Sequence, residues 1–360
     1  MKKILVLLLM ISFGVNLIAC VKKQEAKYEF ELEEIKLKNN NVEVLLDKYD
    51  NHIYYAPYVY RLEEINENAF IYDLDIKENK EKLVSESIYT QMPIFQSLQI
   101  NKDYAMYLDS INSLGKLTIF VENRKSKNIK KLYELENKYK NMETPFLYKN
   151  YVAYITYMEY EDKEIPVVKL HDLNENTQII VQKLNDCGVY NLNIYFYKDK
   201  LYWTDNINNK AFVKYYDLKT KEITTLDLEI SKYPSIEFMD DDYIFILNQN
   251  NIEDYTNAEY ILYDLKEMKE NRIIEKGNYN LFSRIDKGFF SDENIYDSKD
   301  EDNRKKIWFY NIVDGKLNST KLDLKFKGKL ESIVTLFEKN SVFIQSEEND
   351  KYYYYIVKPK

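Results

Sequence analysis

Few side chains in this sequence could act as a nucleophile or bind a transition metal. The 360 residues include two histidines, His52 and His171, and two cysteines, Cys20 and Cys187. Each histidine stands in an apolar, strand-like run, and Cys187 lies in the polar stretch "NDCGVY". A cysteine nucleophile needs a neighbouring base, and no histidine is close to it in the sequence. We therefore predict that both histidines are strand residues and that Cys187 is an inert loop thiol.

Carboxylates are the only abundant groups that could do chemistry. A glycosidase needs two facing acids about 5 to 10 Å apart, but with 60 Asp and Glu residues some pairs will be this close by chance. The sequence contains no GxSxG, P-loop or GxGxxG motif. The acidic run "DSKDEDN" (297–303) lacks the glycine and the distal glutamate of an EF-hand loop, so we interpret it as a solvated loop. We predict no metal and no other cofactor.

The first twenty residues form a separate segment. Lys2 and Lys3 precede an apolar run over 4–19, which is short for a membrane span and typical of an export signal. The run ends in "LIAC" (17–20), which resembles the lipobox of bacterial lipoproteins. The resemblance implies that the precursor is cleaved before Cys20 and that a diacylglyceryl group is attached to this cysteine. The alternatives are an uncleaved anchor or an ordinary secretory signal with a chance cysteine.

These observations divide the chain into a signal peptide (1–19), a lipidated tether (20–27) and a folded region (28–360). Two acyl chains suffice for stable anchoring, so we expect a protein on the cell membrane that faces away from the cytoplasm. Without residues 1–19, 49 Lys and Arg residues stand against 60 Asp and Glu residues, a net charge of −11. So acidic a chain is a poor partner for nucleic acid, whose backbone requires clustered cations.

One sequence pattern recurs throughout the folded region. It consists of an aromatic run, an acid, a turn rich in Lys, Glu and Asn, and a second apolar run, as in "KYYDLKTKEITTL" (214–226) and "YILYDLKEMKENRII" (260–274). Aligned on the acid, the repeats fall at Asp73, Glu122, Asp172, Asp217, Asp264, Asn311 and, in the last copy, Ile356. The steps are 45 to 50 residues long. Seven near-equal periods indicate an array of seven structural units.

Each unit contains four short runs rich in Tyr, Phe, Ile and Val, separated by turn residues, which predicts four strands. Four-stranded units with a period of this length predict a β-propeller, because closure into a ring leaves few free sheet edges. An Asp or Asn at the end of the third strand can accept hydrogen bonds from the following turn, which explains the repeated acid. We predict an all-β fold, a seven-bladed β-propeller of four-stranded antiparallel blades.

Two resemblances agree with this fold. "LYWTD" (201–205) resembles the YWTD motif of the low-density-lipoprotein-receptor propellers and falls on the predicted second strand, as in that family. It occurs once, and that family has six units rather than seven, so we interpret it as a shared strand pattern and not as kinship. Residues 28–357 resemble the TolB-like and related propellers found in many bacterial lipoproteins. This resemblance implies the fold and little about activity.

The last repeat contains three apolar runs where the first six contain four. The segment "YEFELEEIKL" (28–37) precedes the first blade and alternates apolar residues with glutamates, the pattern of a half-buried strand. We predict that it pairs with residues 352–357 as the fourth strand of the last blade and so closes the ring. The alternation slips at Glu33 and Glu34, which predicts a β-bulge there.

The longest insertions are expected between second and third strands, at 56–69, 156–166, 248–259 and 291–306. In a propeller these connections share one face with the blade-to-blade crossings. Tyrosine is favoured in interfaces, although a chain with 35 tyrosines will have some in any loop. The candidate binding face comprises Tyr58, Tyr60, Tyr157, Tyr160, Asp254, Tyr255, Tyr296 and Asp297.

The sequence therefore predicts a non-catalytic binding or scaffold module for a protein, a peptide or a cell-wall glycan of the envelope. One alternative is a carbohydrate-active hydrolase that uses paired carboxylates at the channel mouth. Another is a purely structural subunit of an envelope complex, which a wide apolar patch on the side of the wheel would indicate.

Overall fold

The computed structural model describes residues 28–37, 43–58, 68–90, 93–111, 116–136, 145–161, 163–185, 194–207, 210–230, 233–249, 258–277, 283–292, 306–336 and 340–360. All regular secondary structure within these ranges is β-strand. No helix that is long and apolar enough to span a membrane occurs among these residues.

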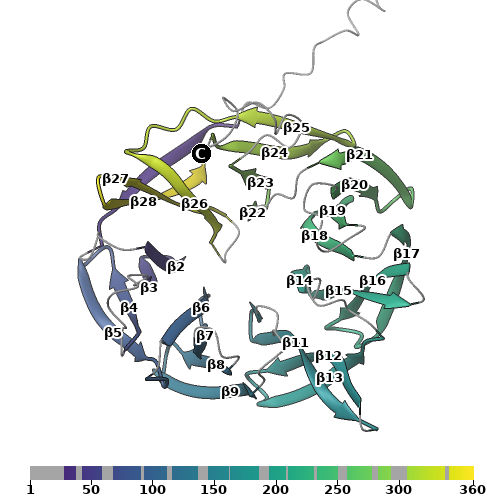
Figure 1. The fold of residues 1–360 in the computed structure, drawn as a ribbon, viewed down its shortest axis with the longest axis horizontal. Helices are drawn as coiled ribbons and strands as arrows, with labels where there is room; N and C mark the ends of the chain where they lie inside the picture. Colours follow the sequence, from purple (N-terminus) through teal and green to yellow (C-terminus); the bar gives the residue numbers. More distant parts are fainter. Residues whose placement is uncertain are drawn as a thin grey trace, which may run out of the picture.

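The strands form seven four-stranded antiparallel sheets arranged in a ring (Figure 1), which confirms the predicted seven-bladed propeller. Blades 1 to 3 consist of β2 (Glu43–Tyr49), β3 (His52–Tyr58), β4 (Phe70–Asp75) and β5 (Lys80–Glu86); β6 (Pro93–Ile100), β7 (Tyr104–Ile111), β8 (Lys116–Asn123) and β9 (Asn128–Glu136); and β10 (Phe146–Tyr148), β11 (Tyr151–Tyr160), β12 (Lys163–Asp172) and β13 (Thr177–Lys183).

Blades 4 to 6 consist of β14 (Ile194–Tyr197), β15 (Lys200–Ile207), β16 (Lys210–Asp217) and β17 (Ile223–Ile230); β18 (Tyr233–Met239), β19 (Tyr243–Gln249), β20 (Ala258–Asp264) and β21 (Lys269–Gly277); and β22 (Ser283–Ile285), β23 (Gly288–Ser291), β24 (Trp308–Val313) and β25 (Lys316–Lys321). Blade 7 consists of β26 (Lys329–Thr335), β27 (Val342–Glu348), β28 (Lys351–Pro359) and β1 (Phe30–Ile35).

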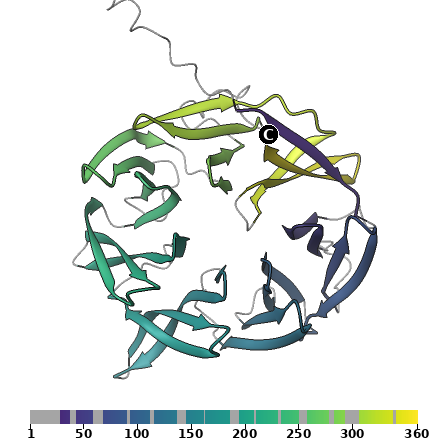
Figure 2. The same cartoon turned by 180° about the vertical axis from the view of Figure 1, so that it is seen from behind.

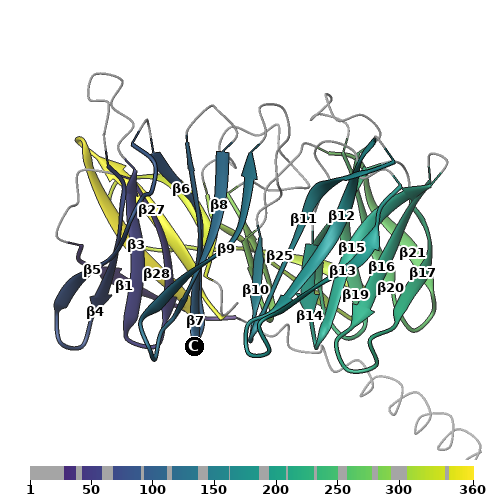
Figure 3. The same ribbon diagram turned by 90° about the horizontal axis from the view of Figure 1, so that it is seen from below.

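The first strand of each blade is innermost, and the two ends of the wheel differ (Figures 1 and 3). Because the strands alternate in direction, the first-to-second and third-to-fourth hairpins share one end, which we call the hairpin end. The second-to-third connections and the crossings between blades lie at the opposite end, the loop end. In Figure 3 the hairpin end is at the bottom, where the chain also terminates.

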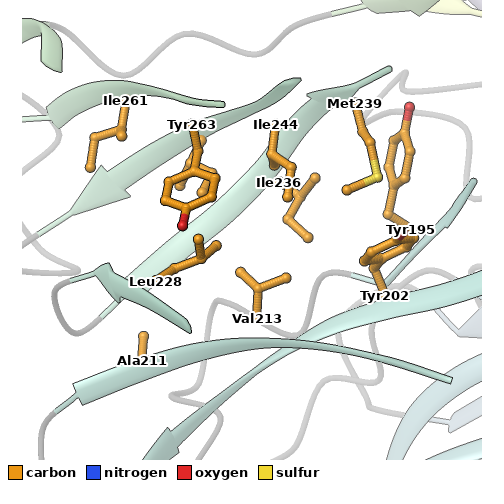
Figure 4. Close-up of a cluster of buried hydrophobic side chains, with 11 residues drawn as sticks. Tyr195, Tyr202, Ala211, Val213, Leu228, Ile236, Met239, Ile244, Ile261 and Tyr263 are labelled. Atoms are coloured by element: carbon orange, nitrogen blue, oxygen red, sulfur yellow. The ribbon is translucent and has the colours of Figure 1, made fainter. Parts of the chain in front are cut away.

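Each interface between neighbouring blades has its own hydrophobic core. Seven clusters of buried side chains occur in the described residues, and each one joins two adjacent blades. Figure 4 shows the cluster between blades 4 and 5, where Val213 and Tyr202 face Ile236 and Ile244. The strands are apolar on both sides because each sheet is covered by a neighbour on each side.

The ring is closed by β1, as predicted. It pairs antiparallel with β28, from Phe30 opposite Pro359 to Ile35 opposite Tyr354, and Figure 2 shows the two strands side by side. The paired residues of β28 are 354–359, two positions nearer the C-terminus than the predicted 352–357. The predicted bulge at Glu33 and Glu34 is wrong, because the register is continuous there. Both glutamates lie on an outer edge strand, where a partly exposed side chain needs no bulge to reach water.

The repeated acid accepts hydrogen bonds from the hairpin turn in blades 3 to 5, as predicted, but its position was predicted wrongly in blades 1, 2 and 6. In blade 6 the predicted Asn311 is buried inside β24, opposite Asn318. In blades 1 and 2 the acceptors are Asp75 and Asn123, not Asp73 and Glu122. With Asp172, Asp217 and Asp264 they each accept two backbone N–H groups at 2.8 to 3.2 Å. Asp73 and Glu122 lie inside their strands and are buried, so the turn N–H groups are bonded by the acceptors two residues and one residue further on.

The fifth residue of each of these turns, counting the acceptor as the first, has a positive φ. These residues are Asn79, Lys127, Asn176, Lys221 and Met268, with φ between 51° and 61°. A chain with only seven glycines thus uses asparagine, lysine and methionine in the left-handed region. This regular third-to-fourth hairpin explains why the same sequence pattern recurs along the chain.

The expected loop over 156–166 is instead a continuation of the sheet. Strands β11 and β12 remain paired out to Tyr160 opposite Lys163, so the connection is a tight turn at Glu161, whose φ is 50°. The β-branched and aromatic residues of this stretch extend the strands, which the polar residues between them obscured in the sequence.

Candidate functional site

The predicted binding residues are only partly covered by the structure. Tyr60, Asp254, Tyr255, Tyr296 and Asp297 lie outside the described residues, as do Cys20 and Cys187. Tyr58 ends β3, and its backbone alone is described. The binding face therefore remains a prediction at these positions.

Tyr157 and Tyr160 both lie at the loop end of blade 3, in the last four residues of β11. Their separation of three residues places the two side chains on opposite sides of the sheet. Tyr160 is 43% exposed, and the Lys183 Nζ lies 3.3 Å from the centre of its ring. Tyr157 is half-buried. The structure brings these two tyrosines to the same end of the wheel but to different sides of the blade.

Both histidines are strand residues, as predicted. The His52 Nδ1 lies 2.8 Å from Asp73 Oδ1 at the start of β3. His171 is buried in β12, and its Nε2 lies 3.0 Å from the Tyr154 hydroxyl. Burial, together with nearby Lys169, lowers the pKa of His171 to about 4, so this side chain is neutral at physiological pH.

Two buried aspartates join successive blades at the loop end. Asp109 in β7 accepts hydrogen bonds from the Ser87 hydroxyl at 2.7 Å and the Ile88 N–H at 2.9 Å. Asp205, the acid of "LYWTD", accepts the Asn185 N–H at 3.0 Å and pairs with the Lys214 Nζ at 2.8 Å. Each carboxylate thus caps the chain as it leaves the preceding blade, so the YWTD-like acid has a structural role.

A cavity of about 500 Å³ lies on the inner side of the wheel at the hairpin end. It is lined by the ends of the first strands of blades 3 to 6. The principal lining residues are Phe146, Tyr148, Phe196, Tyr197, Phe238 and Ile285. Lys149, Lys198 and Asp286 stand at its rim and are exposed. The walls are therefore aromatic and the rim carries both signs of charge.

The rim is built from a contact that repeats in consecutive blades. The Tyr148 hydroxyl donates to Asp199 Oδ1 at 3.1 Å, and Lys149 pairs with the same carboxylate. One blade further on, the Tyr197 hydroxyl donates to Asp241 Oδ1 at 3.0 Å, and Lys198 pairs with Asp241. These hydrogen bonds hold the pKa of Asp199 and of Asp241 below its usual range. Each contact ties the first strand of one blade to the hairpin of the next.

The other acids near the cavity also have structural partners. Asp240 accepts the Asp242 N–H at 2.8 Å and the Tyr243 N–H at 2.7 Å, and burial raises its pKa. Glu237 is buried and lies 3.4 Å from the Arg284 Nη2. No group of three or more His, Cys, Asp or Glu side chains suited to a metal occurs in the described part of the chain. Each of these acids is therefore held by groups of its own chain.

Sequence reasoning missed this cavity because it searched the long connections and not the first strands. A signal was present: "FLYKN" (146–150) and "YFYKDK" (195–200) repeat a Tyr-Lys pair just before the hairpin of two consecutive blades. The partners Asp199 and Asp241 are over forty residues away from their lysines and come from the next blade, so only the ring identifies them.

Two solved structures with TM-scores above 0.5 support the fold. The chain superposes on a prolyl endopeptidase with a TM-score of 0.55 and 10% identity, over 89% of this chain and 51% of that one. It also matches the β-propeller domain of the Trilobed protease from Pyrococcus furiosus, with a TM-score of 0.52 and 11% identity, over 88% and 95% of the two chains. TolB from Acinetobacter baumannii matches with a TM-score of 0.42 and 11% identity, over 88% and 79%.

The chain is a β-propeller. At these identities the likeness shows the fold alone, and the chain spans about half the length of the prolyl endopeptidase that it matches. No family model matches the sequence, and no curated protein matches it significantly.

Proposed function

We propose that this protein is a lipid-anchored, non-catalytic binding module outside the cytoplasm, which binds a protein, a peptide or a cell-wall glycan at the loop end of the propeller. The observation that carries the proposal is the position of β1. Its first residue, Phe30, pairs with Pro359, so the folded chain starts at the hairpin end. Tyr28 is the eighth residue after Cys20, a reach of roughly 25 to 30 Å when the chain is extended. An anchor at Cys20 would thus turn the loop end away from the membrane.

The loop end is also where the candidate side chains lie. Tyr157 and Tyr160 are at that end, and Tyr58 ends the second strand of blade 1 there. Tyrosine provides a large amphipathic contact surface at low conformational cost. Binding is favoured over hydrolysis because the acids near the cavity, such as Asp241 and Glu237, are held by cationic side chains of neighbouring blades.

The anchor is tested by replacing the lipidated cysteine. Cys20→Ser should release the protein from the membrane fraction or leave the precursor uncleaved, because the thioether to the diacylglyceryl group cannot form. Fractionation and the mass of the mature N-terminus provide the measurement. A Cys20→Ser variant that remains membrane-bound and normally processed would show that the lipid is not on this residue.

The binding face is tested by crosslinking in intact cells. A photoreactive amino acid at Tyr160 should give covalent adducts, whereas the same group at Lys219, an exposed residue at the hairpin end, should not. Replacing Tyr58, Tyr157, Tyr255 and Tyr296 with serine should abolish the adducts and lower the melting temperature only slightly, because the half-buried Tyr157 lies near the end of β11 and not in a core between blades. Equal adducts from both ends, or a variant that fails to fold, would contradict the proposal.

A carbohydrate-active hydrolase is the second candidate, favoured by the raised pKa of Asp240 beside the cavity. Asp286, which is exposed at the rim, would be the other carboxylate. Reducing-end release from cell-wall oligosaccharides measures this activity. The binding proposal expects none from the parent protein; activity that disappears in both Asp240→Asn and Asp286→Asn would establish the hydrolase instead.

A further inference from the structure

Exposed aliphatic side chains recur in the third-to-fourth hairpins and in the half of each outer strand that starts from them. Eleven large apolar residues are exposed in the described part of the chain, and seven of them lie within four residues of the left-handed residue of a third-to-fourth hairpin. These seven, which we call the aliphatic rim, are Leu83, Ile129, Ile179, Ile180, Ile223, Met268 and Val313, and their exposed fractions run from 39% to 54%. Each of blades 1 to 6 contributes at least one.

The aliphatic rim is unusual in both its position and its composition. Scattered exposed apolar residues are normal, but a gathering of them marks a surface that meets a protein or a membrane. Met268 occupies the left-handed position of its turn, with a φ of 51°, where asparagine would be the unstrained choice. Met268 exposes 48% of its surface to water, and its place in the turn does not require an apolar side chain.

The hairpins that carry the rim are close to neutral. The six turns at 75–80, 123–128, 172–177, 217–222, 264–269 and 313–316 contain ten Lys and Arg residues and nine Asp and Glu residues. The mature chain as a whole has 49 cationic and 60 acidic residues, so its excess of acid lies elsewhere. The first-to-second hairpins at the same end are acidic, with seven Asp and four Lys residues in the described turns 50–51, 101–103, 149–150, 198–199, 240–242 and 286–287. The six third-to-fourth hairpins, with their exposed aliphatics and long lysine stems, are the part that suits the interfacial region of a bilayer, where lysines keep their charge in water.

The anchor would enter the wheel at this same end. Blade 7 has no third-to-fourth hairpin, because its fourth strand is β1, and the start of β1 occupies the corresponding position beside the end of β28 (Figure 3). A tether of eight residues keeps this end within roughly 25 to 30 Å of the lipid. The hairpin end is therefore the surface that meets the membrane first.

We propose that the propeller rests on the lipid surface with its hairpin end down, the aliphatic rim buried in the headgroup region. The inference builds on the proposed anchoring through Cys20 and adds a second, direct contact between the folded domain and lipid. The contact is apolar, so it depends little on the fraction of anionic lipid. It also turns the aromatic cavity towards the bilayer and fixes the loop end as the outward face.

The test measures the depth of two positions in the lipidated full-length protein. An environment-sensitive fluorophore is placed on a single cysteine, either at Met268→Cys in the rim or at Glu161→Cys in the turn at the loop end, with Cys187 replaced by serine. The protein is reconstituted in zwitterionic vesicles with and without nitroxide-labelled headgroups. We expect the fluorophore at 268 to be quenched several-fold more than the one at 161, with the same contrast after anionic lipid is added.

A further variant, Ile129→Ser, Ile179→Ser and Ile223→Ser, should remove most of the quenching at 268 while Cys20 keeps the protein on the vesicle. Quenching that is equal at both positions, or absent at 268 in membrane-bound protein, would overturn the inference and leave the anchor intact. Protein that does not associate with vesicles at all would overturn the anchoring itself. A fluorophore at 268 that is shielded from water but not quenched would show that a protein, such as a second copy, covers the rim.

Discussion

Asp109 shows at the scale of one residue how the fold constrains an acid. It is fully buried, and burial raises its pKa to about 6 in spite of the hydrogen bonds from Ser87 and Ile88. The folded state then binds more protons than the unfolded state between about pH 4 and 6. The free energy of unfolding should therefore fall as the pH rises through this window and be constant above it.

Asp109→Asn should abolish this contribution, because an amide keeps the shape and does not titrate. The unfolding free energy of the parent relative to the variant should fall by on the order of 3 kcal/mol between pH 4 and pH 7. Denaturant unfolding of both proteins at a series of pH values measures the difference. A difference that does not change with pH would mean that Asp109 titrates normally.

Asp205 is the matched comparison, because it caps a blade in the same way but carries the buried Lys214 as its partner. Asp205→Asn should cost about 3 to 5 kcal/mol, since it leaves a buried ammonium without its counter-charge. Asp205→Asn combined with Lys214→Met should recover most of the loss. A single variant as stable as the parent would show that this ion pair contributes little.

At the scale of an element, β1 is the strand on which closure depends. It contributes Ile35, together with Leu37 just beyond its end, to the core between blades 7 and 1, and Phe30 and Leu32 to the core between blades 6 and 7. The ring of Phe30 packs at 4.9 Å from Phe309 and at 5.4 Å from Phe290. A single strand thus joins three blades.

Deleting residues 28–37 should lower the free energy of unfolding by on the order of 5 kcal/mol, from the burial that is lost. It should also promote aggregation, because β28 becomes an open edge. Thermal melting and light scattering provide the measurements. Glu31→Gln with Glu33→Gln is the control: their ion pairs with Lys358, at 3.7 and 3.4 Å, are at the surface and should be worth less than about 1 kcal/mol. A deletion that melts like the parent would mean that closure does not depend on β1.

At the scale of the whole molecule, stability is distributed around the ring. Each of the seven cores joins two blades, so no blade can unfold without exposing two interfaces. Trp203 is fully buried in the core between blades 3 and 4. This arrangement predicts that a cavity in one interface weakens the entire wheel.

Trp203→Ala should cost about 3 to 5 kcal/mol and leave a single unfolding transition. Amide exchange in the best-protected strands of every blade, including β28 on the far side of the ring, should accelerate by a similar factor. Hydrogen exchange followed by mass spectrometry resolves the strands. Acceleration confined to blades 3 and 4 would show that the blades unfold independently.

The sequence by itself determined the number of blades, the four strands in each and the strand that closes the ring. These features depend on local patterns, namely the alternation of apolar residues and turn signals that recur about every 47 residues, and alternation is read along a single strand. The same reasoning failed where the outcome depended on neighbours. Asp73 and Asp75 are the same residue type, two positions apart, and the sequence does not distinguish them. Only the pairing of β3, β4 and β5 buries Asp73 and leaves Asp75 at the turn.

The candidate surfaces depended still more on tertiary structure. The contact between Lys149 and Asp199 joins residues fifty positions apart, and the cavity exists only because the first strands of four blades converge. The aliphatic rim is likewise a property of the ring: one or two exposed apolar residues at each of six separate hairpins mean little until closure places the six hairpins at one end. Short-range pattern specified the blades, and the geometry of closure decided which distant residues share a surface.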